Sequence, residues 1–258
     1  MDEITTSVLL VCIASFAAGF TDAIVGGGGL IQTPVLFMAF PQYPAATLLG
    51  TTKIPSFSGT AISLFQFAKH VKLQWKILLP IAGIAFFSAM AGSSLVSTMS
   101  NETFKPIILM ALCAVAIYTY RKKNFGQHQD KVEIKYAMAK ALSSGLIIGF
   151  YDGFIGPGTG SFLVLAFVGL LGFDFLHASA HAKSVNLATN FASIVFFIST
   201  GHVLWWLALP MAICNMLGGY AGTKLALIKG NIMVRQFFLC VVALTIIRFA
   251  YDVLLKSD

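Results

Sequence analysis

Two stretches decide the fold, GFTDAIVGGGGL at residues 19–30 and GFYDGFIGPGTG at residues 149–160. Each places an aspartate, Asp22 or Asp152, three residues after a glycine and continues into a glycine-rich turn. The two stretches align at an offset of 130 residues without a gap, and the same offset superposes Lys53 on Lys183. Further pairs in this register are Trp75 with Trp205, Pro80 with Pro210, Gly92 with Gly222 and Asn101 with Asn231. The sequence therefore predicts a tandem repeat of one unit.

The composition indicates an integral membrane protein. Hydrophobic residues make up 57% of 258 positions and charged residues only 10%, against roughly 25% charged residues in soluble domains. Several apolar runs reach the ~20 residues that cross a bilayer. The predicted spans are residues 45–68, 77–98, 104–120, 177–199, 203–223 and 232–255. We expect a multi-pass protein of the inner (plasma) membrane.

The charge of the loops predicts how the two repeats are oriented. The predicted units are residues 1–125 and 136–258, joined by a basic cytoplasmic linker at residues 126–135. Lys and Arg in short loops favour the cytoplasm, and twelve of the seventeen fall on one predicted side because opposite loops of the two units are basic. This pattern is typical of inverted-topology repeats.

An inverted repeat requires an odd number of full crossings in each unit. Three transmembrane helices fit the apolar runs, so the preceding segment 4–40, broken at residues 26–29, must leave and return to the same face. The fold prediction is an all-α membrane protein of two inverted repeats, each a Gly-broken re-entrant hairpin or half-helix pair plus three transmembrane helices. Non-helical backbone at membrane depth is tolerated only beside protein or a water-filled cavity, so the breaks predict a cavity.

Two polar stripes on corresponding helices are the strongest indication of a site. They follow the spacing i, i+3, i+7, i+10, which places each set on one helical face. The stripes are Lys53, Ser56, Thr60 and Ser63, and Lys183, Asn186, Asn190 and Ser193. A lysine in mid-membrane costs about 2.5–3.5 kcal/mol. The functional interpretation is an anion site flanked by two ammonium groups; the alternatives are ion pairs with Asp22 or Asp152, or lysines that reach an interface.

The glycine turns are candidate oxyanion contacts. Backbone N–H groups near Gly27, Gly28, Gly158 and Thr159 could converge on an anion, and a following half-helix would direct its positive dipole end to the same point. Neither turn matches a Walker A motif, because no Lys-Ser or Lys-Thr follows the last glycine. Close helix packing is the alternative role of these glycines.

Other polar groups give weaker indications. His177 and His181 are four residues apart, but no third ligand beyond Asp174 is near in sequence, so we predict no metal and no cofactor. His181, with Asp22 and Asp152, is a candidate for a proton or cation step. The basic residues are scattered through short loops, which argues against nucleic acid. The expected partners are a small anion and the lipid bilayer, with a homodimer left open.

At these residues the sequence resembles the TauE/SafE family of sulfite and organosulfonate exporters. The resemblance rests on residues 19–30 with Pro34 and Thr52-Lys53, and on residues 149–160 with His181-Ala182-Lys183, Asn186 and Asn190. It covers nearly the whole chain. It implies a secondary transporter for sulfite, sulfoacetate or related sulfur-containing anions, and it indicates a substrate class rather than one compound.

The leading hypothesis is therefore a non-enzymatic anion transporter that works by alternating access. The alternative from another class is a membrane-embedded enzyme for a lipid or isoprenoid, using His177, His181 and Asp152. The symmetry of the repeat argues against it, because a catalytic centre usually needs unlike groups at the two positions. A structural assembly factor, for example for metal delivery, is a third alternative.

Overall fold

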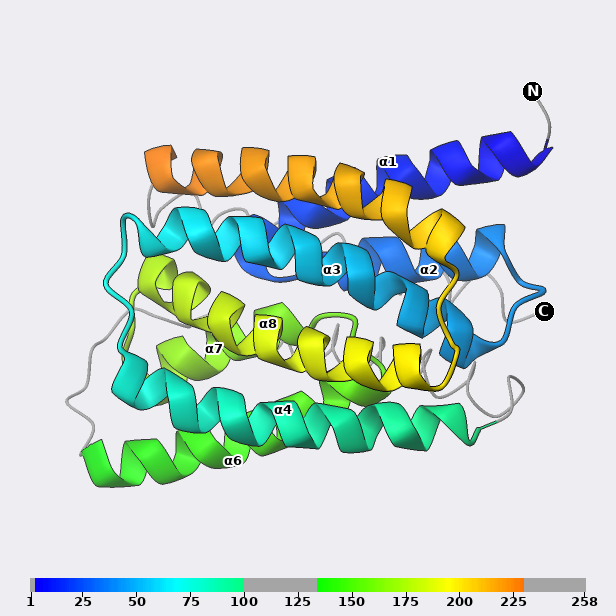
Figure 1. Ribbon diagram of the computed structural model, residues 1–258. Coiled ribbons are helices and arrows are strands. Elements are labelled where there is room, and N and C mark those ends of the chain that lie inside the picture. The colour runs from blue at the N-terminus through cyan, green and yellow to red at the C-terminus, as the bar shows by residue number, and fades with distance from the viewer. Residues whose placement is uncertain (1–2, 100–133, 230–258) are drawn as a thin grey trace, which may run out of the picture.

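The computed structural model describes residues 3–99 and 134–229, and within these ranges all regular secondary structure is α-helix (Figure 1). The predicted spans 104–120 and 232–255 and most of the linker at 126–135 lie outside the described residues. The helices are α1 (Glu3–Val25), α2 (Gly29–Ala39), α3 (Ala45–Ala68), α4 (Trp75–Ser97), α6 (Ile134–Phe154), α7 (Thr159–Leu171), α8 (Phe175–Ser199) and a final helical segment at 205–229. The prediction of an all-helical protein is confirmed for the described residues.

The helices repeat with the period found in the sequence. Helices α2, α3 and α4 begin at Gly29, Ala45 and Trp75, and α7, α8 and segment 205–229 each begin 130 positions later. Corresponding helices run in opposite directions in Figure 1: α3 runs from right to left, whereas α8 runs from left to right. Helix α4 and segment 205–229 are opposed in the same way.

The fourth helix of each repeat packs against the other repeat. Helix α4 lies along α6 and α8 and barely touches α3. Its close approach to α6 depends on Gly149 and Gly153, where a Cβ atom would overlap the backbone of Ala85 and Ala89, as in small-residue helix pairs in membranes. Segment 205–229 contacts α1 in the corresponding way, with Gly19 against the backbone of Asn215.

This exchange defines two mixed bundles. The first mixed bundle contains α1, α2, α3 and segment 205–229, and the second contains α6, α7, α8 and α4. Helices α3 and α8 pack on each other where the bundles meet. Among the described residues, the helices of each repeat are therefore divided between the two mixed bundles, a feature that the sequence did not indicate.

The glycine break forms where it was predicted, but the helix before it is long. Helix α1 is continuous over 23 residues, about 35 Å at 1.5 Å per residue. It contains no proline, and a single glycine, Gly19, does not interrupt it. Helix α2 has only 11 residues and α7 has 13. The expected pair of short half-helices is thus a long helix followed by a short one.

The outer surface of the helices is apolar. Phe87 is 72% exposed, Ile147 67% and Ile228 69%, which is the surface expected where lipid tails replace water. Among the described helices, Ile4–Val25 and Trp75–Ser97 are long and apolar enough to cross a membrane. Helices α3 and α8 have 24 and 25 residues, and their lower hydropathy reflects the polar stripes that they turn inward.

Candidate functional site

The two glycine turns meet at the centre of the protein. Gly26 and Gly156 have φ angles of +82° and +90°, a region that L-residues with a side chain rarely adopt. The Ser161 N–H donates to the Gly26 carbonyl oxygen over 3.0 Å, and the Ser161 hydroxyl donates to the Val25 carbonyl oxygen over 3.0 Å. A Cβ atom at Gly26 would overlap the backbone of Gly160. The two repeats therefore touch through backbone at this point.

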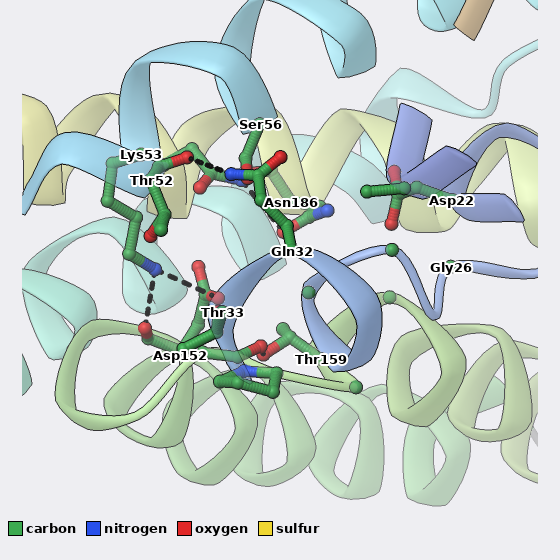
Figure 2. A pocket seen from close by; sticks show the side chains of 18 of the residues that line it. Asp22, Gly26, Gln32, Thr33, Thr52, Lys53, Ser56, Asp152, Thr159 and Asn186 are labelled. Carbon is green, nitrogen blue, oxygen red and sulfur yellow. Dashed lines mark hydrogen bonds and ion pairs between the residues drawn. The ribbon is translucent and has the colours of Figure 1, made fainter. Parts of the chain in front are cut away.

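A small polar cavity of about 40 Å³ lies beside this junction. A buried water needs roughly 10–15 Å³ by the same measure, so the cavity has room for a few waters or one compact anion. Residues of both mixed bundles line it, and Figure 2 shows polar side chains converging on it. The N-terminal ends of α2 and α7, at Gly29 and Thr159, also border it. Helix N-termini carry partial positive charge that favours anions.

Each repeat supplies a lysine that pairs with the aspartate of the other repeat. Lys53 Nζ lies 3.1 Å from Asp152 Oδ1 and donates to the Asp152 carbonyl oxygen over 2.6 Å. Lys183 Nζ lies 2.5 Å from Asp22 Oδ2 and also donates to the Asp22 carbonyl oxygen. The pairing is reciprocal, as in a two-fold symmetric interface. Both pairs connect the first mixed bundle to the second.

These pairs are deeply buried. The side chains of Lys53 and Asp152 are 5% and 4% exposed, and those of Lys183 and Asp22 are 3% and 19% exposed. Removing one partner from a buried pair typically costs about 3–5 kcal/mol, because an uncompensated charge remains. The four groups together are electrically neutral, which allows them to lie inside the membrane region.

Several predicted residues line the cavity together. They are Asp22, Gly28, Lys53, Ser56, Asp152, Gly158, Thr159, Asn186 and Asn190. Asn190 Nδ2 donates to Asn186 Oδ1 over 3.0 Å and to the Asn186 carbonyl oxygen over 2.8 Å. The structure thus places side chains from α1, α3, α6 and α8 around one small volume.

Other predicted residues lie outside the lining. Lys183 is held against Asp22 behind the cavity wall, and Thr60 donates to Asp22 Oδ2 over 3.4 Å. Gly27 belongs to the turn but does not face the cavity. Further along the stripes, Ser63 donates to the Gly59 carbonyl oxygen, and Ser193 Oγ lies 3.0 Å from Ser93 Oγ of α4. The distal ends of both stripes therefore serve helix packing.

His181 also lies away from the cavity. Its Nε2 accepts from the Gln74 N–H at 3.1 Å, and its Nδ1 lies 2.7 Å from the His177 carbonyl oxygen. The ring packs against both Phe167 and Phe173, which stack on each other. These contacts define a neutral imidazole that joins α8 to the loop before α4. The arrangement does not bring the histidines to Asp152, as the enzymatic alternative requires.

His177 has a local partner. Its Nδ1 lies 2.6 Å from Asp174 Oδ2, while Asp174 Oδ1 accepts from the N–H groups of Leu176 and His177. Asp174 is thus the N-cap of α8. Within the described residues, no group of three His, Cys, Asp or Glu side chains could hold a metal ion.

Sequence reasoning missed a buried amide network at one wall of the cavity. Gln32 Oε1 accepts from Asn215 Nδ2 at 2.9 Å and from the Ser15 hydroxyl at 3.1 Å, and Gln32 Nε2 donates to the Thr52 carbonyl oxygen at 3.2 Å. Gln32 and Asn215 are 2% and 4% exposed. They have no polar counterpart in the other repeat, where Phe162 and Ala85 stand. Their polarity within apolar helices was the available signal. Thr33, Thr52, Gly26, Gly156, Pro157 and Gly160 also line the cavity without having been predicted to bind substrate.

These features define a class of protein. The chain is a helical membrane protein whose apolar exterior surrounds a charged, polar cavity between broken helices, an arrangement typical of membrane transporters.

The comparisons with known proteins give the family. The sulfite exporter TauE/SafE model matches residues 11–249, and the chain belongs to this family. A probable membrane transporter protein of Sinorhizobium sp, ORF9, is 34% identical over 93% of this chain and 91% of its own length. A probable membrane transporter protein of Haemophilus influenzae is 34% identical over 95% of this chain and 94% of its own length. The probable membrane transporter protein YfcA of Escherichia coli K12 is 33% identical over 91% of this chain and 86% of its own length. No solved structure matches significantly. The relatives are named as transporters and not as enzymes, and this protein is a membrane transporter of the TauE/SafE type.

Proposed function

We propose that this protein is a secondary transporter that moves a small anion across the inner membrane by alternating access. The substrate class is that of sulfur oxyanions and organosulfonates, such as sulfite or sulfoacetate. The observation that carries the proposal is the small polar cavity beside the two glycine turns, which Lys53 borders. The family supports the substrate class, since its description names sulfite export.

The chemistry of the cavity suits an oxyanion. The Lys53 ammonium group has three N–H donors. Two of them bind Asp152, at its Oδ1 and its carbonyl oxygen, so the third is available to an anion. Ser56, Asn186 and Thr159 add hydroxyl and amide donors, and the α2 and α7 N-termini add positive potential. Charge-assisted hydrogen bonds of this kind are roughly twice as strong as neutral ones. A pyramidal or tetrahedral oxyanion would use several of these donors at once.

The arrangement of the helices supports inverted repeats as the basis of alternating access. Corresponding helices run in opposite directions, and the lysine–aspartate pairs are exchanged between the repeats. Because α4 and segment 205–229 are also exchanged, the moving units in this proposal are the two mixed bundles and not the sequence halves. Both ion pairs cross the interface between the bundles. Breaking one pair while the other stays closed would open the cavity to one side of the membrane.

The membrane potential bears on the direction of transport. One negative charge that leaves an inside-negative cell gains about 2.3 kcal/mol per 100 mV. Export of an anion can therefore proceed without a coupling ion, whereas uptake against the potential requires one.

Flux measurements in liposomes test the proposal. The purified protein is reconstituted, and the efflux of radiolabelled sulfite and sulfoacetate is measured. Lys53→Met combined with Asp152→Asn removes both charges of a pair and leaves neither unpaired, so the fold is retained. We expect this variant to lose transport, while Lys76→Met, at an exposed position, keeps it.

Two results would refute parts of the proposal. Undiminished flux in the Lys53/Asp152 double variant would exclude Lys53 as the anion-binding group. Absence of flux of any sulfur-containing anion by the wild-type protein, together with no thermal stabilisation by a panel of such anions, would exclude the proposed function.

A further inference from the structure

One buried carboxylate oxygen of a residue that lines the cavity has no hydrogen-bond partner. Asp152 is 3% exposed; its Oδ1 pairs with Lys53, but its Oδ2 is buried without any hydrogen bond. Among buried side-chain atoms in the described residues, only Thr223 Oγ1 shares this state. A buried acceptor without a hydrogen-bond partner is unfavourable, and more so when it is charged. Binding of a proton or a hydrogen-bonding ligand at Asp152 Oδ2 would therefore be favourable.

The charges around the cavity balance before any substrate binds. The titratable groups in its lining are Asp22 of α1, Lys53 of α3 and Asp152 of α6, and Lys183 of α8 contacts Asp22 from behind. Two ammonium and two carboxylate groups sum to zero. A bound anion adds an uncompensated negative charge in a site of low dielectric, which is costly. One proton bound with the anion restores neutrality.

The geometry selects Asp152 over the other acids. Asp22 Oδ2 accepts from Lys183 and Thr60, and neither oxygen of Asp22 is buried without a partner, unlike Asp152 Oδ2. Tyr151, next to Asp152, donates its hydroxyl hydrogen to the Pro157 carbonyl oxygen over 2.6 Å, and His181 lies outside the cavity. A protonated carboxyl group has one O–H donor. Protonated at Oδ2, Asp152 would release Lys53 to the anion and could itself donate to it.

We infer that Asp152 is the proton-coupling group of the transporter and that one proton moves with each anion. The proposal rests on the proposed function and specifies how that function is driven. The proton binds to the Asp152 carboxylate from the water on one side, and leaves with the anion on the other. A monoanion then moves without net charge and responds to the pH gradient and not to the membrane potential. A dianion that moves with one proton keeps one negative charge, so the potential still favours its export.

Methanesulfonate is a suitable probe, because its charge is constant across the experimental pH range. Wild-type protein in liposomes is given either a pH gradient at zero potential or a potential at equal pH. We expect the probe to accumulate roughly tenfold per pH unit, since one unit corresponds to about 1.4 kcal/mol per proton. A potential alone should give no accumulation, and a trapped pH dye should report about one proton per anion.

Substitutions at Asp152 test coupling when accumulation is measured relative to exchange. Asp152→Asn has the charge of the protonated side chain but leaves Lys53 without its partner, so its exchange of internal for external methanesulfonate should be slower. Whatever exchange remains should no longer give accumulation when a pH gradient is applied. Asp152→Glu should retain this accumulation. Asp174→Asn is the control, because Asp174 lies outside the cavity and asparagine preserves the N-cap of α8. This variant should accumulate methanesulfonate in response to the pH gradient as the wild type does.

The outcomes are distinct from failure of the proposed function. Transport of methanesulfonate by wild type without proton movement, or driven by the potential alone, would overturn the coupling proposal while transport itself stands. A full response to the pH gradient in Asp152→Asn would overturn the role of Asp152. If the wild-type protein moves no sulfur-containing anion, the proposed function fails, and the coupling proposal with it.

Discussion

The two lysine–aspartate pairs come from equivalent positions in the repeat, yet their surroundings differ. Lys53 and Asp152 both border the cavity, and one carboxylate oxygen has no partner. Lys183 does not line the cavity, whereas its partner Asp22 does and accepts a further hydrogen bond from Thr60. Duplication thus produced two similar ion pairs, of which the first contributes both partners to the cavity lining and the second only its aspartate. We interpret the first as the pair that contacts the substrate and the second as the pair that holds the bundles together.

Removal of each whole pair is the strongest test of this difference. Lys53→Met with Asp152→Asn should reduce anion flux about 100-fold, close to 2.8 kcal/mol and within the range for hydrogen bonds to charged groups. Lys183→Met with Asp22→Asn should reduce it about tenfold or less, because Lys183 does not line the cavity. Flux per folded protein in liposomes gives both values. Equal losses would remove the distinction between the pairs.

A single substitution at Lys183 should reveal its structural role. Lys183→Met leaves the buried Asp22 carboxylate unpaired, which should destabilise the protein by about 3–5 kcal/mol. Adding Asp22→Asn should restore most of this loss. Thermal unfolding in detergent, followed by size-exclusion chromatography, measures the effect. Identical melting temperatures for the single and double variants would contradict a stabilising pair.

Replacement of a glycine at the junction tests how the pairs are brought together. Gly26→Ala should cost about 1–3 kcal/mol for its positive φ angle, and more because the Cβ overlaps Gly160. Gly201 also has a positive φ angle, +75°, but a Cβ atom there would meet no other atom within 4 Å. Gly201→Ala should therefore lose only the free energy that the positive φ angle costs an alanine. Thermal stability and flux should fall further for Gly26→Ala. Similar results at both positions would argue against a tight contact between the turns.

The smallest effect is expected at Thr60. Its hydroxyl donates to Asp22 Oδ2 over a long 3.4 Å, so Thr60→Val should destabilise the protein by about 0.5 kcal/mol, the low end for a hydrogen bond. The flux should stay within a factor of two or so, since about 0.5 kcal/mol corresponds to little more than this. A tenfold loss of flux would place Thr60 in direct contact with the substrate.

Some residues of the site could be predicted from sequence because duplication and polarity coincide there. Lys53, Asp152 and Asn186 each have a polar counterpart 130 positions away, and a polar residue in an apolar helix is costly unless it is used. Gln32 and Asn215 were not predicted, because a comparison of the repeats favours positions that are polar in both. The equivalent positions in the other repeat are Phe162 and Ala85. Patterns shared by both halves do not identify a residue that only one half contributes.

The sequence alone determined the helical class, the period of 130 residues and the place of the glycine breaks, because these depend on local composition and on spacing along the chain. Tertiary structure decided which aspartate pairs with which lysine, that α4 and segment 205–229 pack on the opposite repeat, and that only Lys53 of the two lysines borders the cavity. The physical reason is that these features depend on contacts between residues distant in sequence. Close packing selects such contacts from many alternatives that the same apolar and polar pattern permits.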